Sequence, residues 1–156
     1  MAVMNITPDS FSDGGSLYRD RADLDLVFAH AERCLSEGAT ILDVGGESTR
    51  PGAKPVSEAE ELARVIPVIE GLASRFDAVI SVDTSTPQVM IAAACAGARL
   101  MNDVRALQRE GAIAAALETG LPVCLMHMQG TPQTMEHRPE YGDAVAAVYR
   151  WLVISV

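Results

Sequence analysis

The stretch Thr40-Ile41-Leu42-Asp43-Val44 is a short, mostly apolar run that ends against the pair Gly45-Gly46. A run of this length, bounded by glycine, predicts a buried β-strand. Before it, apolar residues recur at helical spacing over 24–35, and Gly38 follows as a helix-terminating residue. The stretch therefore lies in a helix–strand–loop succession.

The same unit recurs along the chain. After residues 40–44, Ser57 and Glu60 have the spacing of a capping box that starts a second helix. Thr86 and Pro87 predict the start of a third helix, with Gly97 at its end. Further strands are predicted at 3–5, 79–82, 100–102 and 122–126, and further helices around 112–118 and from about 141 onward.

Strands that alternate with helices pair in parallel through right-handed crossovers. Two α/β architectures have this pattern. One is a doubly wound open sheet, for which five strands could be complete. The other is a (β/α)₈ barrel, of which five strands would be only a part.

Composition limits the function classes. The chain has 156 residues, of which 49% are hydrophobic, which suits one soluble domain with a packed core. Its net charge of −9 and the lack of a basic cluster argue against binding to nucleic acid or to anionic membranes. No segment approaches the ~20 apolar residues of a membrane span. Three scattered cysteines in apolar contexts predict buried thiols and a reducing, cytoplasmic location: Cys34, Cys95 and Cys124.

Polar residues end the predicted strands: Asn5, Asp43, Asp83, Asn102-Asp103 and, less clearly, His127. In both architectures ligands bind outside the carboxyl ends of the strands. Together these side chains predict one ring of hydrogen-bond donors and acceptors around a ligand. Each alone is equally explained as a turn-former, because Asp and Asn favour strand exits. His127 could also be a structural histidine.

Two glycine-containing loops add to this ring. The loop over 7–15 carries Phe11, which predicts either a lid that packs on substrate or a side chain that folds back on the core. The loop over 45–53 carries Ser48, Thr49 and Arg50 between glycines, which suits an anion. It matches no phosphate-loop or dinucleotide fingerprint.

Several strings resemble the dihydropteroate synthases. They are MNITPDSFSDGG (4–15), ATILDVGGESTRPGA (39–53), ISVDT (80–84), MNDV (101–104) and PVCLMHMQGTPQTM (122–135). They occur in the order and at about the intervals of that family, and the match weakens only after about Tyr141. The first two strings are long and specific, whereas ISVDT and MNDV would be weak alone.

The resemblance implies a (β/α)₈ TIM barrel, here its first five β/α units. It implies a transferase of folate biosynthesis that joins a pterin methyl diphosphate to p-aminobenzoate and releases pyrophosphate, with Mg²⁺ as cofactor. The implied roles are metal contact for Asn5, diphosphate contacts for Thr49 and Arg50, and pterin contacts for Asp83 and Asn102. Phe11 and Pro51 would enclose p-aminobenzoate, where sulfonamides compete.

The resemblance also indicates that residues 1–156 form a pterin-binding domain that is incomplete at its C-terminal end. Complete members carry an Asp-Pro-Gly segment, a Ser-Arg-Lys string and a late Arg-x-His, and the sequence contains none of them. The apolar ending at 151–156 points the same way. We therefore expect little or no activity from this chain alone and a homodimer for a full-length protein. The alternatives are a non-catalytic pterin-binding module and a pterin-dependent methyltransferase domain.

Overall fold

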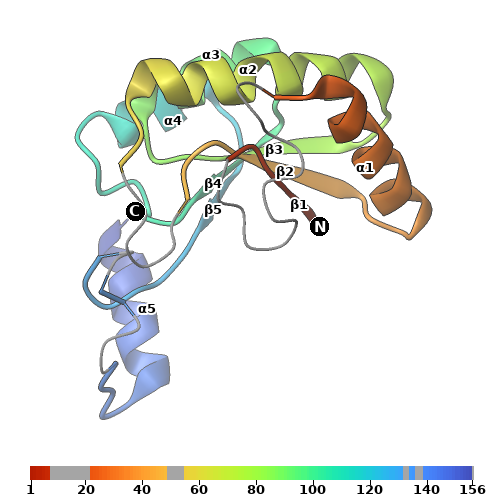
Figure 1. Ribbon diagram of the computed structural model, residues 1–156. Coiled ribbons are helices and arrows are strands. Elements are labelled where there is room, and N and C mark those ends of the chain that lie inside the picture. The colour runs from red at the N-terminus through yellow and green to blue at the C-terminus, as the bar shows by residue number, and fades with distance from the viewer. Residues whose placement is uncertain (8–21, 49–54, 132–133, 136–138, 156) are drawn as a thin grey trace.

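The computed structural model describes residues 1–7, 22–48, 55–131, 134–135 and 139–155. Within them, five strands form one parallel sheet in the order β1-β2-β3-β4-β5 (Figure 1). A doubly wound sheet reverses its strand order at a switch point, whereas a barrel adds each strand beside the last. The sequential order is therefore that of consecutive β/α units of a (β/α)₈ barrel, as the resemblance implied.

The strands are short and in continuous register. Their bounds are β1 Ala2–Asn5, β2 Ile41–Gly45, β3 Val79–Asp83, β4 Leu100–Asp103 and β5 Val123–Leu125. All five lie within a residue or two of the predicted runs. Each strand pairs with its sequence neighbour in parallel, so the carboxyl ends of all five meet at one edge of the sheet.

Helices follow the strands in alternation. Their bounds are α1 Leu24–Ser36, α2 Glu58–Arg75, α3 Pro87–Ala96, α4 Ala112–Thr119 and α5 Ala144–Ser155. Gly38 has φ +100° and follows α1 as predicted. The amides of Gly38 and Ala39 donate to the carbonyls of Leu35 and Cys34, which satisfies two carbonyls of the last turn.

Two predicted caps differ in detail. The Ser57 hydroxyl accepts from the amide of Glu60 as a capping residue should, but the Glu60 carboxylate pairs with Arg64 one turn later. Thr86 stands at the N-cap of α3, yet its side chain makes no capping hydrogen bond. Arg64 instead donates to the carbonyl of Gly46, and the Thr86 hydroxyl donates to the Glu61 carboxylate.

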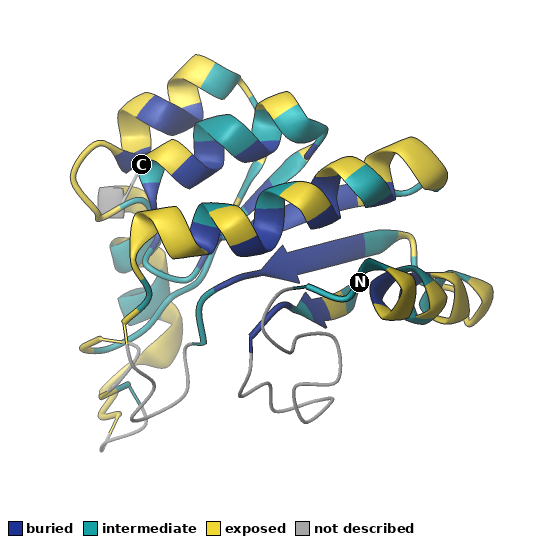
Figure 2. Ribbon diagram, turned by 45° about the horizontal axis from the view of Figure 1, so that its top comes forward, coloured by how far each residue is buried: buried dark blue, intermediate teal, exposed yellow. Residues whose placement is uncertain are grey.

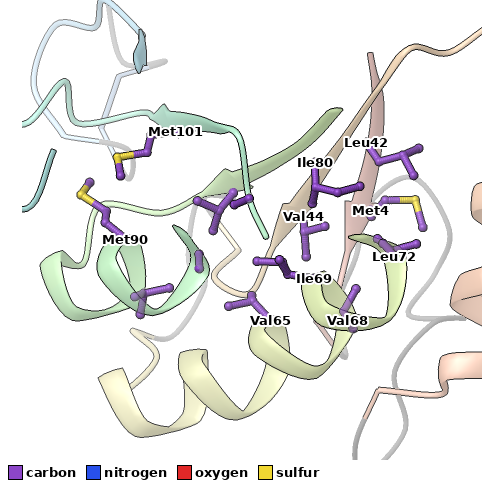
Figure 3. Close-up of a cluster of buried hydrophobic side chains, with 14 of the residues drawn as sticks. Met4, Leu42, Val44, Val65, Val68, Ile69, Leu72, Ile80, Met90 and Met101 are labelled. Atoms are coloured by element: carbon purple, nitrogen blue, oxygen red, sulfur yellow. The ribbon is translucent and has the colours of Figure 1, made fainter. Parts of the chain in front are cut away.

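The core lies between the sheet and the helices. Figure 2 shows buried stripes on the helices where they face the strands. In Figure 3, Met4, Leu42, Val44 and Ile80 of the strands meet the apolar side chains that α2 buries, which are Val65, Val68, Ile69 and Leu72. Alternation along a strand sends every second residue to the opposite face. That opposite face, away from α1–α4, is where the site lies.

One prediction about side chains is wrong. Cys95 and Cys124 are exposed and Cys34 is only half-buried, so the cysteines are not core thiols. In the last helix, Val145 is 81% exposed. In Figure 1, α5 lies apart from the layer of α1–α4. None of the helices in the described part of the chain combines the length and apolarity needed to cross a bilayer.

Candidate active site at the carboxyl edge of the sheet

Five residues lie side by side on the face of the sheet opposite the helices. The strand registers align Asn5 with Gly45, Gly45 with Asp83, Asp83 with Asn102, and Asn102 with Cys124. We call this set the upper row: Asn5, Gly45, Asp83, Asn102 and Cys124. It is the last inward-facing row before the loops begin, so its side chains are available to a ligand at the mouth of the barrel.

A second row lies two residues below the first. It contains Val3, Asp43, Ser81 and Leu100, again aligned by the strand registers. The amide Nδ2 of Asn102 donates to Asp43 Oδ2 at 2.9 Å, which ties the upper row to this lower row. Asp43 Oδ1 and the Ser81 hydroxyl are buried, and neither has a hydrogen-bond partner among the described residues. The two central residues of the lower row, Asp43 and Ser81, therefore form a polar floor with unused hydrogen-bonding capacity.

Asp83 has an unusual protonation equilibrium. Burial raises the pKa of its carboxyl from 3.8 to about 7, with further increases from the negative charges of Asp43, Asp103, Glu61 and Glu47. A carboxyl with such a pKa exchanges its proton near neutral pH. Strongly perturbed groups in a concave site mark functional residues more often than structural ones. Asp83 is accordingly the strongest candidate of the upper row.

The glycines of β2 leave room beside Asp83. A Cβ at Gly45 would lie 3.5 Å from the Asp83 Cβ, so a side chain here would occupy the space next to the carboxylate. At Gly46 the added Cβ would lie 2.7 Å from Val65, which is too close. Arg64 donates to the carbonyl of Gly46 at 2.7 Å and fixes the start of the loop. The glycine pair thus allows tight packing on one side and an open upper row on the other.

A buried glutamate joins the loop after β3 to helix α2. The Glu61 carboxylate accepts from the hydroxyls of Thr84 at 2.5 Å and Thr86 at 2.7 Å, and Arg109 donates to Thr86 at 2.7 Å. Glu61 is 2% exposed. Sequence reasoning missed it, although Glu61 lies four residues before Val65 and so on the same buried helical face.

Asp103 corrects one part of the predicted ring. As the residue after Asn102 it points to the other side of the strand, where it is fully buried. Its carboxylate accepts from the Ser85 hydroxyl at 2.5 Å and from the amides of Arg105 at 2.8 Å and Leu107 at 2.7 Å. Asp103 therefore shapes the loop after β4 and does not line the inward face.

The same network reaches the loop after β2. Arg105 donates to Glu47 at 3.0 Å and to Ser85 at 3.1 Å. Three loops at the carboxyl edge, which follow β2, β3 and β4, are therefore joined by charged hydrogen bonds. This arrangement holds the mouth of the site in place before any ligand binds. Sequence reasoning missed Glu47, Ser85 and Arg105 because their partners are distant in sequence.

The structure places the remaining predicted residues as follows. Asn5, Asp83 and Asn102 come together in the upper row, as predicted. Phe11, Thr49, Arg50 and Pro51 lie outside the described residues. His127 packs against Tyr141 and, edge-on at 5.2 Å between ring centroids, against Trp151 of α5. Its aromatic packing favours the structural interpretation of His127.

The described residues contain no group of three or more His, Cys, Asp or Glu side chains that could hold a metal ion. Mg²⁺ is commonly bound through one or two protein oxygens, waters and substrate phosphates instead of a full protein cage. The side-chain amide of Asn5 has a carbonyl oxygen, which is a ligand that a hard cation such as Mg²⁺ prefers. The Asn5 side chain can therefore supply one oxygen ligand to such a cation.

Chemically, the two rows suit a flat, polar heterocycle. Asp83 can accept from paired N–H groups when ionised, and Asn102 offers both an acceptor and donors. Neither the upper row nor the lower row contains a nucleophilic dyad of the Ser-His or Cys-His kind. The arrangement can bind, orient and shield a substrate, which is what a reaction between two bound substrates requires.

Comparison with known proteins identifies relatives. Residues 1–156 match the family model described as pterin binding enzyme. The dihydropteroate synthase of Escherichia coli (strain K12) is 56% identical over 156 residues, which are 100% of this chain and 54% of that enzyme. The enzyme of the same name from Haemophilus influenzae is 51% identical over 152 residues, or 97% of this chain and 54% of the relative.

Solved structures agree. The Yersinia pestis dihydropteroate synthase in a sulfonamide drug complex has a TM-score of 0.92 and 55% identity, covering 99% of this chain and 55% of that one. The Xanthomonas albilineans enzyme with 4-aminobenzoic acid has a TM-score of 0.82 and 49% identity, covering 99% and 53%. The chain thus spans about half the length of the relatives it matches.

Proposed function

Because the chain belongs to the family of pterin-binding enzymes, we propose that it supplies the pterin-binding half of a dihydropteroate synthase site. The reaction would join a 6-hydroxymethyl-7,8-dihydropterin diphosphate to p-aminobenzoate with release of pyrophosphate. One observation carries the proposal: Asp83 and Asn102 lie side by side above a polar floor at the carboxyl edge of the sheet. The identity to dihydropteroate synthases along the whole chain supports it.

Asp83 and Asn102 would hold the amino-pyrimidine edge of the pterin. An ionised carboxylate accepts two N–H groups at once, and an amide complements a ring edge that has both donors and acceptors. In a site shielded from water these hydrogen bonds select strongly against rings that lack the matching groups, because the protein groups would then stay unpaired. The row thus supplies orientation and selectivity.

The proposed site also includes four residues outside the described part. Thr49 and Arg50 would hold diphosphate oxygens, and Phe11 and Pro51 would enclose p-aminobenzoate. Their support is the resemblance of the two loop strings, together with relatives solved with a sulfonamide drug and with 4-aminobenzoic acid. Arg50 would act on the reaction itself, because a guanidinium that neutralises the departing diphosphate stabilises charge that grows in the transition state.

Asn5 would contribute an oxygen to the Mg²⁺ that accompanies the diphosphate. Its position in the upper row, at the carboxyl edge of the sheet, supports this role. When bound, Mg²⁺ would neutralise charge on the leaving group. The residues of this chain would orient the pterin methylene toward the amine and exclude water from it.

Half of an active site should not convert the substrates efficiently by itself. The test therefore compares the chain alone with a chimeric enzyme. We expect little or no condensation by the 156-residue chain. A chimera in which it replaces the matched 54% of the Escherichia coli enzyme should condense both substrates and be inhibited by sulfonamides. Asn102→Ala in the chimera should lower kcat/KM for the pterin diphosphate about 100-fold.

A folded chimera without turnover contradicts the proposed function. Clear turnover by the chain alone contradicts the half-site part of it. Pterin binding without p-aminobenzoate consumption in the chimera would favour a non-catalytic binding module.

A further inference from the structure

One contact in the site reaches across an entire strand. Asn102 belongs to β4 and Asp43 to β2, and β3 lies between these strands in the sheet. The 2.9 Å hydrogen bond from Asn102 Nδ2 to Asp43 Oδ2 passes over β3, where the side chains of the two rows belong to Ser81 and Asp83. The small side chain of Ser81 leaves space for the contact.

The contact has a fixed direction. An ionised carboxylate can only accept hydrogen bonds, so only the NH₂ end of the Asn102 amide can approach Asp43. An asparagine without such a partner can turn its oxygen and nitrogen to either side. With Asp43 in place, the Asn102 side-chain amide keeps one orientation. Its Oδ1 atom and its second N–H have no partner among the described residues.

The second oxygen of Asp43 is also informative. Asp43 is 3% exposed, and its Oδ1 lacks a partner in the described part of the chain, as does the neighbouring Ser81 hydroxyl. Buried polar atoms in folded proteins are nearly always hydrogen-bonded, to protein, water or ligand. Asp43 thus gives one carboxylate oxygen to Asn102 and keeps a second, buried oxygen without a described partner at the floor of the site.

We propose that Asp43 is a positioning residue that fixes the orientation of the Asn102 amide and thereby selects a ring by its hydrogen-bonding pattern. Asp43 acts through Asn102, which contacts the ligand. The identity of the ring as a pterin rests on the proposed function. The orientation of the amide does not, because it follows from the Asp43–Asn102 contact alone.

The chain is well suited to a direct test, because Asn5 and Asn102 are its only asparagines. Selective ¹⁵N labelling of asparagine therefore gives two side-chain amide signals, and Asn5 serves as the internal reference. Asp43→Ala should speed water exchange of the Asn102 NH₂ protons about tenfold and leave Asn5 unchanged. Asp43→Asn, which keeps the shape and one acceptor, should restore most of the protection.

Ser81→Ala is the matched control. Ser81 is the register neighbour of Asp43, is equally buried and also has an unpartnered oxygen, but it makes no bond to Asn102. Its removal should leave the Asn102 signal as it is. Equal exchange in the unaltered chain, Asp43→Ala and Asp43→Asn overturns the positioning role. Dispersed backbone amide signals show that each variant is folded.

A second arm measures selectivity by calorimetry with 6-hydroxymethylpterin and 6-hydroxymethyllumazine, in which an oxygen replaces the 2-amino group. Asp43→Ala should reduce the preference for the pterin about tenfold, because a freed amide can turn to suit either ring. An unchanged preference overturns the selective role. If exchange responds as expected but no variant binds the pterin, the positioning role stands and the proposed function fails.

Discussion

A 2.9 Å hydrogen bond joins Asn102 of β4 to Asp43 of β2, although strand β3 lies between those two strands in the sheet. Neighbouring strands lie about 4.8 Å apart, so strands two apart are about 10 Å apart in a flat sheet. Two short side chains span that gap only where the sheet curves toward them. The contact thus shows that the described strands already form a concave surface, which is the inner wall of a barrel segment.

The loop after β4 should depend on Asp103. Asp103→Ala removes the acceptor of the Arg105 and Leu107 amides in a segment where Ala106 and Leu107 have positive φ, 51° and 60°. We expect the free energy of unfolding to fall by about 3 kcal/mol. Urea denaturation followed by circular dichroism measures it. Asp77→Ala, an exposed position, is the control, and equal effects of the two changes would refute this role for Asp103.

Replacement of Gly71 in α2 by alanine should not give the gain in stability that this change usually gives in a helix. Alanine is favoured over glycine by about 1 kcal/mol in a helix interior. Here, however, an added Cβ would lie 2.6 Å and 2.8 Å from ring atoms of Phe28. We expect Gly71→Ala to destabilise the chain by about 1 kcal/mol, since overpacking costs about 1–3 kcal/mol. Phe28→Leu in the same chain should relieve the clash, and a more stable Gly71→Ala single variant would contradict this expectation.

The raised pKa of Asp83 has a consequence for stability. The unfolded chain releases this proton near pH 3.8 and the folded chain near pH 7, so the contribution of Asp83 is most favourable below pH 3.8 and is lost as the pH rises to about 7. Asp83→Asn removes that dependence. The variant should therefore gain stability relative to the unaltered chain over this interval.

The gain has an upper limit of about 4 kcal/mol from the size of the shift. We expect about half of it, because Asp83 is partly exposed. Urea denaturation of both proteins at several pH values measures the difference. A difference that stays constant with pH, or that changes in the other direction, would be incompatible with the raised pKa.

Pterin binding should depend on pH through the same group. Only ionised Asp83 accepts two N–H groups, so affinity should rise with pH and level off above about 7. After burial, the charge of Asp43 is the largest cause of the raised pKa, ahead of Asp103, Glu61 and Glu47. Asp43→Asn should therefore move the midpoint to lower pH. Calorimetric titrations across pH test this, with Ser81→Ala as control, and an unmoved midpoint would count against it.

Much of the site could be predicted because strand ends are local features. The apolar runs and the polar residues that close them placed Asn5, Asp83 and Asn102 at one edge without any knowledge of strand order. The choice between a barrel and a doubly wound sheet depends on long-range pairing, which no local pattern encodes. It needed the resemblance to the dihydropteroate synthases, and the observed strand order agrees with it.

The failures have physical causes too. Asp103 was grouped with Asn102, but adjacent residues of a strand face opposite sides, so the pair could not both line the site. Glu61 was overlooked because an acidic residue in a first turn is usually a helix-dipole residue in solvent. Its burial reflects partners on another loop, Thr84 and Thr86. The proposed roles of Phe11, Thr49, Arg50 and Pro51 remain predictions.

Binding of a pterin by the upper row is tested most directly by calorimetric titration. The chain and its Asn102→Ala variant would be titrated with 6-hydroxymethylpterin above pH 7, where Asp83 is ionised. We predict saturable binding to the unaltered chain and an affinity about tenfold or more lower in the variant. Only dilution heat from the folded, unaltered chain, or equal affinity of the two proteins, would contradict the claim.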